Sequence, residues 1–136
     1  LRAVALGHLT AIHLKSYVGR LSALCGAFLA AIGAGAGITW LLGGGYPHVA
    51  ATIKNMVGGL AGMICDGAKP GCALKISTAL SAAFQASLLS LRNIEISERD
   101  GIIENDLEKT IRNVGTIASE GMNETDRLIL EIMVCK

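Results

Sequence analysis

Most of the chain repeats its hydrophobic positions with the period of an α-helix. Residues 3–17, 104–118 and 124–135 each carry an apolar stripe at three- and four-residue spacing. Two further stretches, 21–42 and 73–91, are apolar on nearly all sides, which is typical of helices inside a core. No segment alternates convincingly with the period of two that a half-buried strand requires. The pattern predicts an all-α fold of about six helices, in which uncharged Gly/Ala-rich central helices are wrapped by amphipathic charged ones.

Glycine, proline and asparagine predict several of the helix ends. The glycines at 43–45 end the second helix, and Pro47 suits the first turn of a third. Gly121 is expected to interrupt the chain before the last helix. Asn123 is expected to cap that helix, with Asp126 completing a capping box. The last helix is expected to turn four apolar side chains inward: Leu128, Ile129, Ile132 and Met133.

The uncharged stretch at residues 21–42 allows two interpretations. Its 22 positions are long enough to span a membrane. Gly33 and Gly37 have the G-x-x-x-G spacing that lets two helices touch, either within one chain or between subunits. Because the stretch is mostly Ala and Gly, which insert weakly into membranes, a buried helix broken near these glycines is favoured. The alternative is a non-enzymatic membrane or packing protein with structural cysteines.

Length and charge restrict the classes of function. The 136 residues suffice for one domain with a core. Because the chain begins without Met inside a helical pattern, we interpret it as a single domain and the C-terminal fragment of a longer protein. Residues 1–92 carry seven Lys/Arg and one acid, a net of +6, whereas residues 93–136 carry five bases and ten acids, a net of −5. A basic half suits a small anion such as a carboxylate, whereas scattered bases and few aromatics argue against nucleic acid.

The four cysteines supply the candidate chemistry. Cys65 and Cys72 flank a glycine-rich loop, Cys25 lies far upstream, and Cys135 falls in the last helix. Their uneven spacing and the lack of a secretory signal favour a reducing cytoplasm and a metal role over a disulfide framework. On spacing alone, metal ligation and buried, inert thiols are equally expected. A zinc-stabilised module, with Cys135 or a histidine as its fourth ligand, is a further alternative.

Three sequence runs, 15–26, 55–75 and 121–126, resemble the C-terminal portion of the L-cysteine desulfidase family. That family is related to the α chain of iron–sulfur L-serine dehydratases, and the similarity extends over nearly the whole chain. The resemblance implies an all-helical domain with a [4Fe–4S] cluster held by Cys25, Cys65 and Cys72, which leaves one iron open to substrate. It implies a lyase that catalyses β-elimination from L-cysteine to pyruvate, ammonia and sulfide. L-serine dehydratase activity is the alternative.

The same resemblance places the catalytic base outside this chain, in the N-terminal part of the enzyme. That part is the expected partner, beside a small amino-acid substrate and a possible second copy in a homo-oligomer. Asp66 is expected to hold the cysteine loop through an Asx turn. Cys135 has no expected counterpart in the family, and its role is left open. The candidate substrate-binding residues, each with an ordinary surface or capping role as the alternative, are Lys15, Arg20, Lys69, Lys75 and Asn123.

Overall fold

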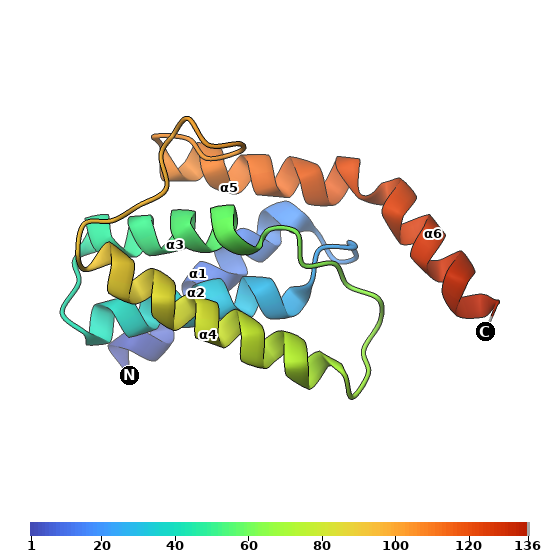
Figure 1. Ribbon diagram of the computed structural model, residues 1–136, viewed down its shortest axis with the longest axis horizontal. Helices are drawn as coiled ribbons and strands as arrows, with labels where there is room; N and C mark the ends of the chain where they lie inside the picture. Colours follow the sequence, from blue (N-terminus) through green and yellow to red (C-terminus); the bar gives the residue numbers. More distant parts are fainter. Residues whose placement is uncertain (136) are drawn as a thin grey trace.

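The computed structural model describes residues 1–135 as a helical bundle without a sheet (Figure 1). Within this range the only extended pairing is an isolated antiparallel bridge between Leu24 and Ile64. The predicted all-α fold with six helices is therefore confirmed. The elements are α1 (Arg2–Val18), α2 (Gly26–Leu41), α3 (Tyr46–Leu60), α4 (Cys72–Ser90), α5 (Leu107–Thr116), the short π-helix η1 (Ile117–Gly121) and α6 (Asn123–Val134).

Helix α2 lies at the centre of the bundle, where α1, α3 and α4 pack around it. It has no charged residue, and Phe28 and Ile32 are fully buried. The predicted break near Gly33 and Gly37 is wrong, because these glycines let a continuous helix approach α1 closely. A Cβ atom on Gly33 would lie only 2.3 Å from the carbonyl oxygen of Gly7. The G-x-x-x-G contact is therefore made within one chain.

Buried hydroxyl groups join α2, α3 and α4. The Oγ1 atom of Thr52 lies 2.7 Å from Oγ1 of Thr39 and 2.7 Å from Oγ of Ser90. The hydroxyl of Ser87 donates to the carbonyl oxygen of Gly35 at 3.1 Å. Among the described residues, no buried side-chain nitrogen or oxygen lacks a partner. Because each hydroxyl contacts a different helix, the network fixes how the three helices are aligned along their axes.

Helix α4 is less central than its apolar composition predicts. It packs on α2 and α3 through small residues such as Ala79 and Ala83, which are fully buried. Its outer side carries large apolar residues that remain exposed. In the described part of the chain, α4 is the one helix long and apolar enough to cross a membrane by these two measures, and 22% of its apolar window is buried. Helix α2, at 16 residues, is shorter than the roughly 20 that a span requires.

The end of the chain departs most from the prediction. Gly121 ends the short π-helix η1, and Met122 forms a non-helical turn before α6, so the predicted interruption before the last helix is confirmed. Asn123 is the first residue of α6, and no side chain caps that helix, so the predicted cap is wrong. Met122 occupies the N-cap position instead, so Asn123 lies one residue too far into the helix to cap it.

Helix α6 leaves the bundle after η1 and packs against no other α-helix of the described chain (Figure 1). None of its residues is buried, so the predicted inward face is also wrong. The residues concerned are Leu128, Ile129, Ile132 and Met133.

Candidate functional site

A short antiparallel pairing brings Cys25 and Cys65 together. The amide of Cys25 donates to the carbonyl oxygen of Met63 at 3.0 Å, and the amide of Cys65 donates to that of Ala23 at 2.6 Å. These bonds flank the isolated bridge between the two segments. Both cysteines therefore lie on the same face of the pairing, at diagonal positions that are typically about 7–8 Å apart.

The pairing also determines where α2 begins. Residues 21–25 are drawn away from the helix to meet the cysteine loop, so α2 begins at Gly26 rather than near residue 21. A diagonal separation of about 7–8 Å exceeds what a disulfide spans without backbone movement. All four cysteines are free thiols in the structure. The backbone thus holds two thiols near each other without joining them.

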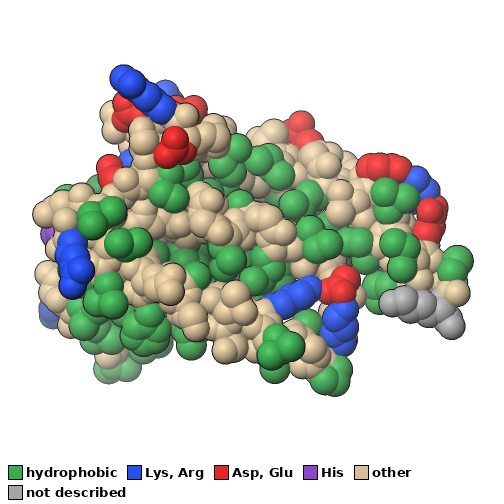
Figure 2. Space-filling model, viewed as in Figure 1, with side chains coloured by type: hydrophobic (Ala, Val, Ile, Leu, Met, Phe, Trp, Pro, Cys, Tyr) green, Lys and Arg blue, Asp and Glu red, His purple; other side chains and the backbone are tan. Residues whose placement is uncertain are grey.

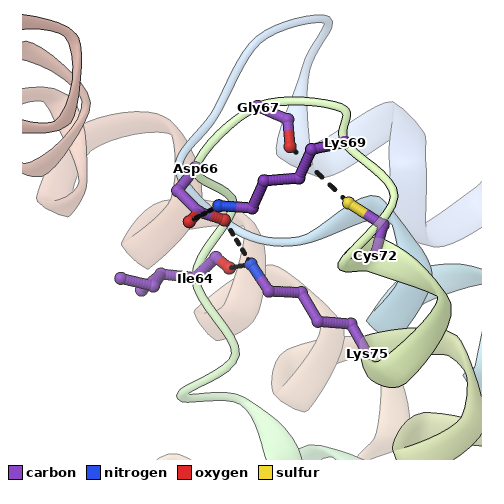
Figure 3. Close-up of polar contacts among 6 residues, drawn as sticks. All are labelled: Ile64, Asp66, Gly67, Lys69, Cys72 and Lys75. Carbon is purple, nitrogen blue, oxygen red and sulfur yellow. Dashed lines mark hydrogen bonds and ion pairs between the residues drawn. The ribbon is translucent and has the colours of Figure 1, made fainter. Parts of the chain in front are cut away.

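Cys72 brings the third thiol to the same place. It is the first residue of α4, and its Sγ donates to the carbonyl oxygen of Gly67 at 3.6 Å (Figure 3). Gly67 has a φ of 90°, a left-handed conformation that favours glycine and turns the loop back toward α4. Cys25, Cys65 and Cys72 all line one cavity of about 570 Å³. Its other walls are Gly26, Ala27, Ala30, Ala31 and Ala34 of α2, Gly67 and Ala68 of the loop, and Ile76 and Leu80 of α4.

The donor set of this cavity is soft. Cys25 is buried, Cys65 and Cys72 are half-buried, and no carboxylate or imidazole is among the lining residues. Within the described range, the side chains do not converge into a ready group of three metal ligands. Thiolates of this kind suit iron–sulfur clusters and soft metals rather than Mg²⁺ or Ca²⁺. Neither Cys135 nor a histidine lines the cavity, so the zinc alternative lacks its fourth ligand here.

Asp66 makes ion pairs and not the predicted Asx turn. Its carboxylate accepts hydrogen bonds from the ammonium groups of Lys69 and Lys75 (Figure 3). Lys75 also donates to the carbonyl oxygen of Ile64 at 2.8 Å. The two lysines, Lys69 foremost, hold the pKa of Asp66 well below its usual range. Lys75 therefore ties the cysteine loop to α4, and Asp66 offsets the cost of a cation in the first turn of that helix.

Lys75 also lies close to the thiols. Its pKa is raised mainly by the hydrogen bond to Asp66, which outweighs the lowering by desolvation. The charges of Asp66, Cys25 and Cys72 raise it further. The structure thus places this lysine beside the cavity as a neighbour of two thiols.

The other predicted residues lie outside the cavity. Lys15 and Arg20 are exposed at the end of α1, where the ammonium of Lys15 donates to the carbonyl oxygen of Arg20 at 3.4 Å. Asn123 is exposed at the start of α6. None of the three is among the cavity-lining residues. Of the five predicted substrate-binding residues, the structure brings Lys69 and Lys75 to the cysteine loop.

Sequence reasoning missed how the end of the chain supports the site. The hydroxyl of Ser22 donates to the carbonyl oxygen of Ala118 in η1 at 2.8 Å and accepts from the amide of Leu24 at 3.1 Å. In addition, a Cβ atom on Gly67 would lie 3.0 Å from Cε of Met133, so α6 touches the cysteine loop. A π-helix interrupts the usual hydrogen-bond ladder, and such turns are frequent at functional sites. No local sequence signal marks these contacts, because they join segments far apart in the chain.

Comparison with known proteins identifies the family. A family model described as the serine dehydratase alpha chain matches residues 1–131, which is nearly the whole chain. The chain belongs to this family. The relation to serine dehydratase α chains that the sequence runs predict is thereby confirmed, and the family relation indicates a lyase-related role.

Curated relatives that the chain matches are named UPF0597 proteins. The relative from Oleidesulfovibrio alaskensis is 54% identical over 135 residues, which cover 99% of this chain and 32% of the relative. UPF0597 protein BF3560 from Bacteroides fragilis is 50% identical over 136 residues, covering 100% and 32%. The relative from Aeromonas hydrophila is 46% identical over 135 residues, covering 99% and 31%. The chain thus spans about a third of the length of these curated relatives, and no solved structure matches it.

Proposed function

We propose that this chain is the cluster-binding domain of a [4Fe–4S]-dependent lyase that converts L-cysteine to pyruvate, ammonia and sulfide. One observation carries the proposal: three thiols from distant parts of the sequence line one cavity in a member of the serine dehydratase alpha chain family. Cys25, Cys65 and Cys72 would hold the cluster, because thiolates are the usual ligands of iron–sulfur centres. Bound there, a cluster with one open iron would supply a Lewis acid for the substrate's carboxylate and leaving group.

The residues around the thiols support the handling of a small amino acid. The side chain of Lys69 is 45% exposed at the loop, and its ammonium can attract the substrate carboxylate, although Asp66 competes for it. Lys75 holds the loop against α4 and keeps a positive charge beside the thiols. The alanines of α2 leave room next to Cys25, and the apolar walls limit the access of water. Lys15, Arg20 and Asn123 are proposed for more distant contacts with substrate.

L-Serine is the second candidate substrate, because the matching family model describes a serine dehydratase. The two reactions share the removal of the proton from Cα and differ in the group that leaves Cβ. The leaving group is sulfide from cysteine and water from serine. The cavity walls near the thiols are apolar and do not distinguish a thiol from a hydroxyl leaving group, so the two substrates must be compared directly.

The rest of the protein is proposed to supply what this chain lacks. Relatives about three times as long contain further sequence, and we assign the catalytic base to it. A cytoplasmic location suits both an exposed cluster and reduced thiols. A homo-oligomer stays a prediction.

The test is made on the full-length parent protein, purified without oxygen. We expect about four iron atoms and as many acid-labile sulfides per chain, together with pyruvate release from L-cysteine faster than from L-serine. Cys65→Ser and Cys72→Ser should lose most of the iron, since each removes one proposed ligand. Cys135→Ser is the matched control and should retain it, because Cys135 does not line the cavity.

Full iron content in the Cys65→Ser or Cys72→Ser protein would refute the ligand assignment. Absence of iron after anaerobic reconstitution of the unaltered protein would refute the cluster itself. Faster pyruvate release from L-serine would transfer the assignment to a serine dehydratase.

A further inference from the structure

Helix α4 carries a long apolar stripe on its outer side. Ile76, Leu80, Phe84 and Leu88 follow one another at intervals of four residues and are 56%, 39%, 50% and 54% exposed. Residues at this spacing share one side of a helix. The stripe begins at the cysteine cavity, because Ile76 and Leu80 are among its walls.

The stripe continues across α2. Ala30 and Ala34 of α2 line the cysteine cavity on one side and a second cavity, of about 330 Å³, on the other. That second cavity lies between α1 and α2 and is lined almost wholly by apolar groups. One apolar surface therefore runs over both helices. We call it the α2–α4 face, and define it as Ala30, Ala34, Ile76, Leu80, Phe84 and Leu88.

The charges of the chain avoid this surface. Helix α2 has no charged residue, and the only one on α4 is Lys75, which is paired with Asp66. The acidic side chains lie mainly along the top and right of the molecule, over the segment before α5 and over α5 and α6 (Figure 2). A helix surface that faces water normally carries charged or polar residues. An extended apolar surface without them marks an interface.

We propose that the α2–α4 face is covered by the remaining part of the full-length polypeptide, outside residues 1–136. The chain accounts for 32% of the length of its relatives, so two thirds of the protein are available to cover it. Because Ile76 and Leu80 belong to both the face and the cavity, the same cover forms a further wall beside the three thiols. The inference rests on the proposed function in this last respect and in its argument against a second copy, whereas the cover itself requires no cluster.

A second copy of the chain and a membrane suit the face less well. A second copy would bring another uncharged face but none of the additional residues that the reaction requires. To span a membrane, α4 would have to leave the bundle and expose Ala79 and Ala83, which are fully buried there.

Hydroxyl-radical footprinting of the full-length protein tests the proposal. Phe84 serves as the reporter and Leu130 of α6, which is 60% exposed, as an exposed internal reference. Labelling is measured by mass spectrometry at several protein concentrations, without detergent, in the cluster-free and the reconstituted protein. We expect labelling of Phe84 at least tenfold below that of the urea-unfolded protein at every concentration, with or without the cluster.

The other outcomes overturn the proposal. Protection that disappears on dilution would assign the face to a second copy, and protection only with added lipid vesicles would assign it to a membrane. Phe84 labelled as fast as in the unfolded protein would show that nothing covers it. Because the cluster-free protein is included, a failed cluster assignment and a failed cover give different results.

A pair of substitutions on the same helix provides a second measurement. Phe84→Glu places a charge on the proposed interface, whereas Gln85→Glu adds the same charge to a neighbouring exposed position outside the face. We expect Phe84→Glu in the full-length protein to increase limited proteolysis between this domain and the remainder, and Gln85→Glu to leave it unchanged. Equal proteolysis of the two variants, with native helical content, would overturn the proposal.

Discussion

The contact between α1 and α2 predicts that two glycine-to-alanine substitutions change the stability of the chain in opposite directions. Gly33→Ala places a Cβ atom 2.3 Å from the carbonyl oxygen of Gly7, whereas ordinary contacts begin near 3.4 Å. The two helices must therefore separate by about 1.1 Å, since the obstacle is backbone and cannot rotate away. Gly59→Ala near the end of α3 meets no atom within 4 Å and is the matched control.

The magnitudes follow from two competing effects. Replacing glycine by alanine inside a helix gains up to about 1 kcal/mol, of which Gly59→Ala near a helix end should keep about 0.5. Overpacking of a core typically costs about 1–3 kcal/mol, and a backbone obstacle favours the upper end. Gly33→Ala should therefore destabilise the chain by about 2 kcal/mol net, which leaves a difference of about 2.5 kcal/mol between the variants.

Urea unfolding of residues 1–136, followed by far-ultraviolet circular dichroism, measures this difference. Both variants should retain the m value of the unaltered chain, because neither changes the surface exposed on unfolding. In thermal unfolding, about 2.5 kcal/mol corresponds to a gap of roughly 10 °C for a chain of this size. A Gly33→Ala protein as stable as the Gly59→Ala protein would refute the close helix contact.

Three further predictions concern the hydroxyl network, the cysteine loop and the support of Cys25. Thr52→Val should lower the free energy of unfolding in urea by about 1–3 kcal/mol, because it removes the partner of the buried Thr39 hydroxyl and one of the two partners of the Ser90 hydroxyl. The ion pairs of Asp66 stabilise the fold fully above its unfolded-state pKa of about 3.9 and are lost as pH falls toward its lowered folded value. Unfolding measured between pH 7 and pH 2 should therefore show a weaker loss of stability below about pH 4 in Asp66→Asn than in the unaltered chain. Ser22→Ala should lower the free energy of local opening around Cys25 by about 1 kcal/mol and so speed hydrogen exchange at the Cys25 amide about fivefold.

Each of these predictions has a control or a contradicting result. Ser81→Ala, at an exposed hydroxyl of α4, should change stability by less than about 0.5 kcal/mol, in contrast to Thr52→Val. Identical pH profiles for Asp66→Asn and the unaltered chain would contradict the lowered pKa. Unchanged exchange at Cys25 in Ser22→Ala would mean that the bond to η1 does not hold this segment.

The central helices were predictable from sequence because local rules determine them. The glycines at 43–45 and Pro47 mark the turn between α2 and α3, and the structure ends and starts its helices there. The cysteine loop was also visible, since Gly67 and its neighbours predict a tight turn between two thiols. In these segments no distant contact opposes the local preference.

The errors arose where distant contacts outweigh local patterns. The apolar residues at 21–25 fit a helical pattern, but the backbone of this segment pairs with a segment about 40 residues later in the chain. Gly33 suggested a break in the helix, but its role is to let α1 approach α2 closely, which a local pattern does not show. The apolar residues of α6 imply a core-facing helix, yet the direction set by η1 takes the helix away from the core. Periodicity alone cannot indicate which surface will meet such a face.

The pairing of residues 23–25 with 63–65 links the candidate metal site to folding. Its two segments are about 40 residues apart, so the pairing closes a long loop and depends on the helices α2 and α3 that lie between them. In the unfolded chain the thiols are scattered, and a metal centre that needs all three has no site there. Loading is therefore coupled to folding, and a loaded centre would stabilise the folded chain by mass action. The same pairing that aligns two cysteines thus also makes their use depend on the folded bundle.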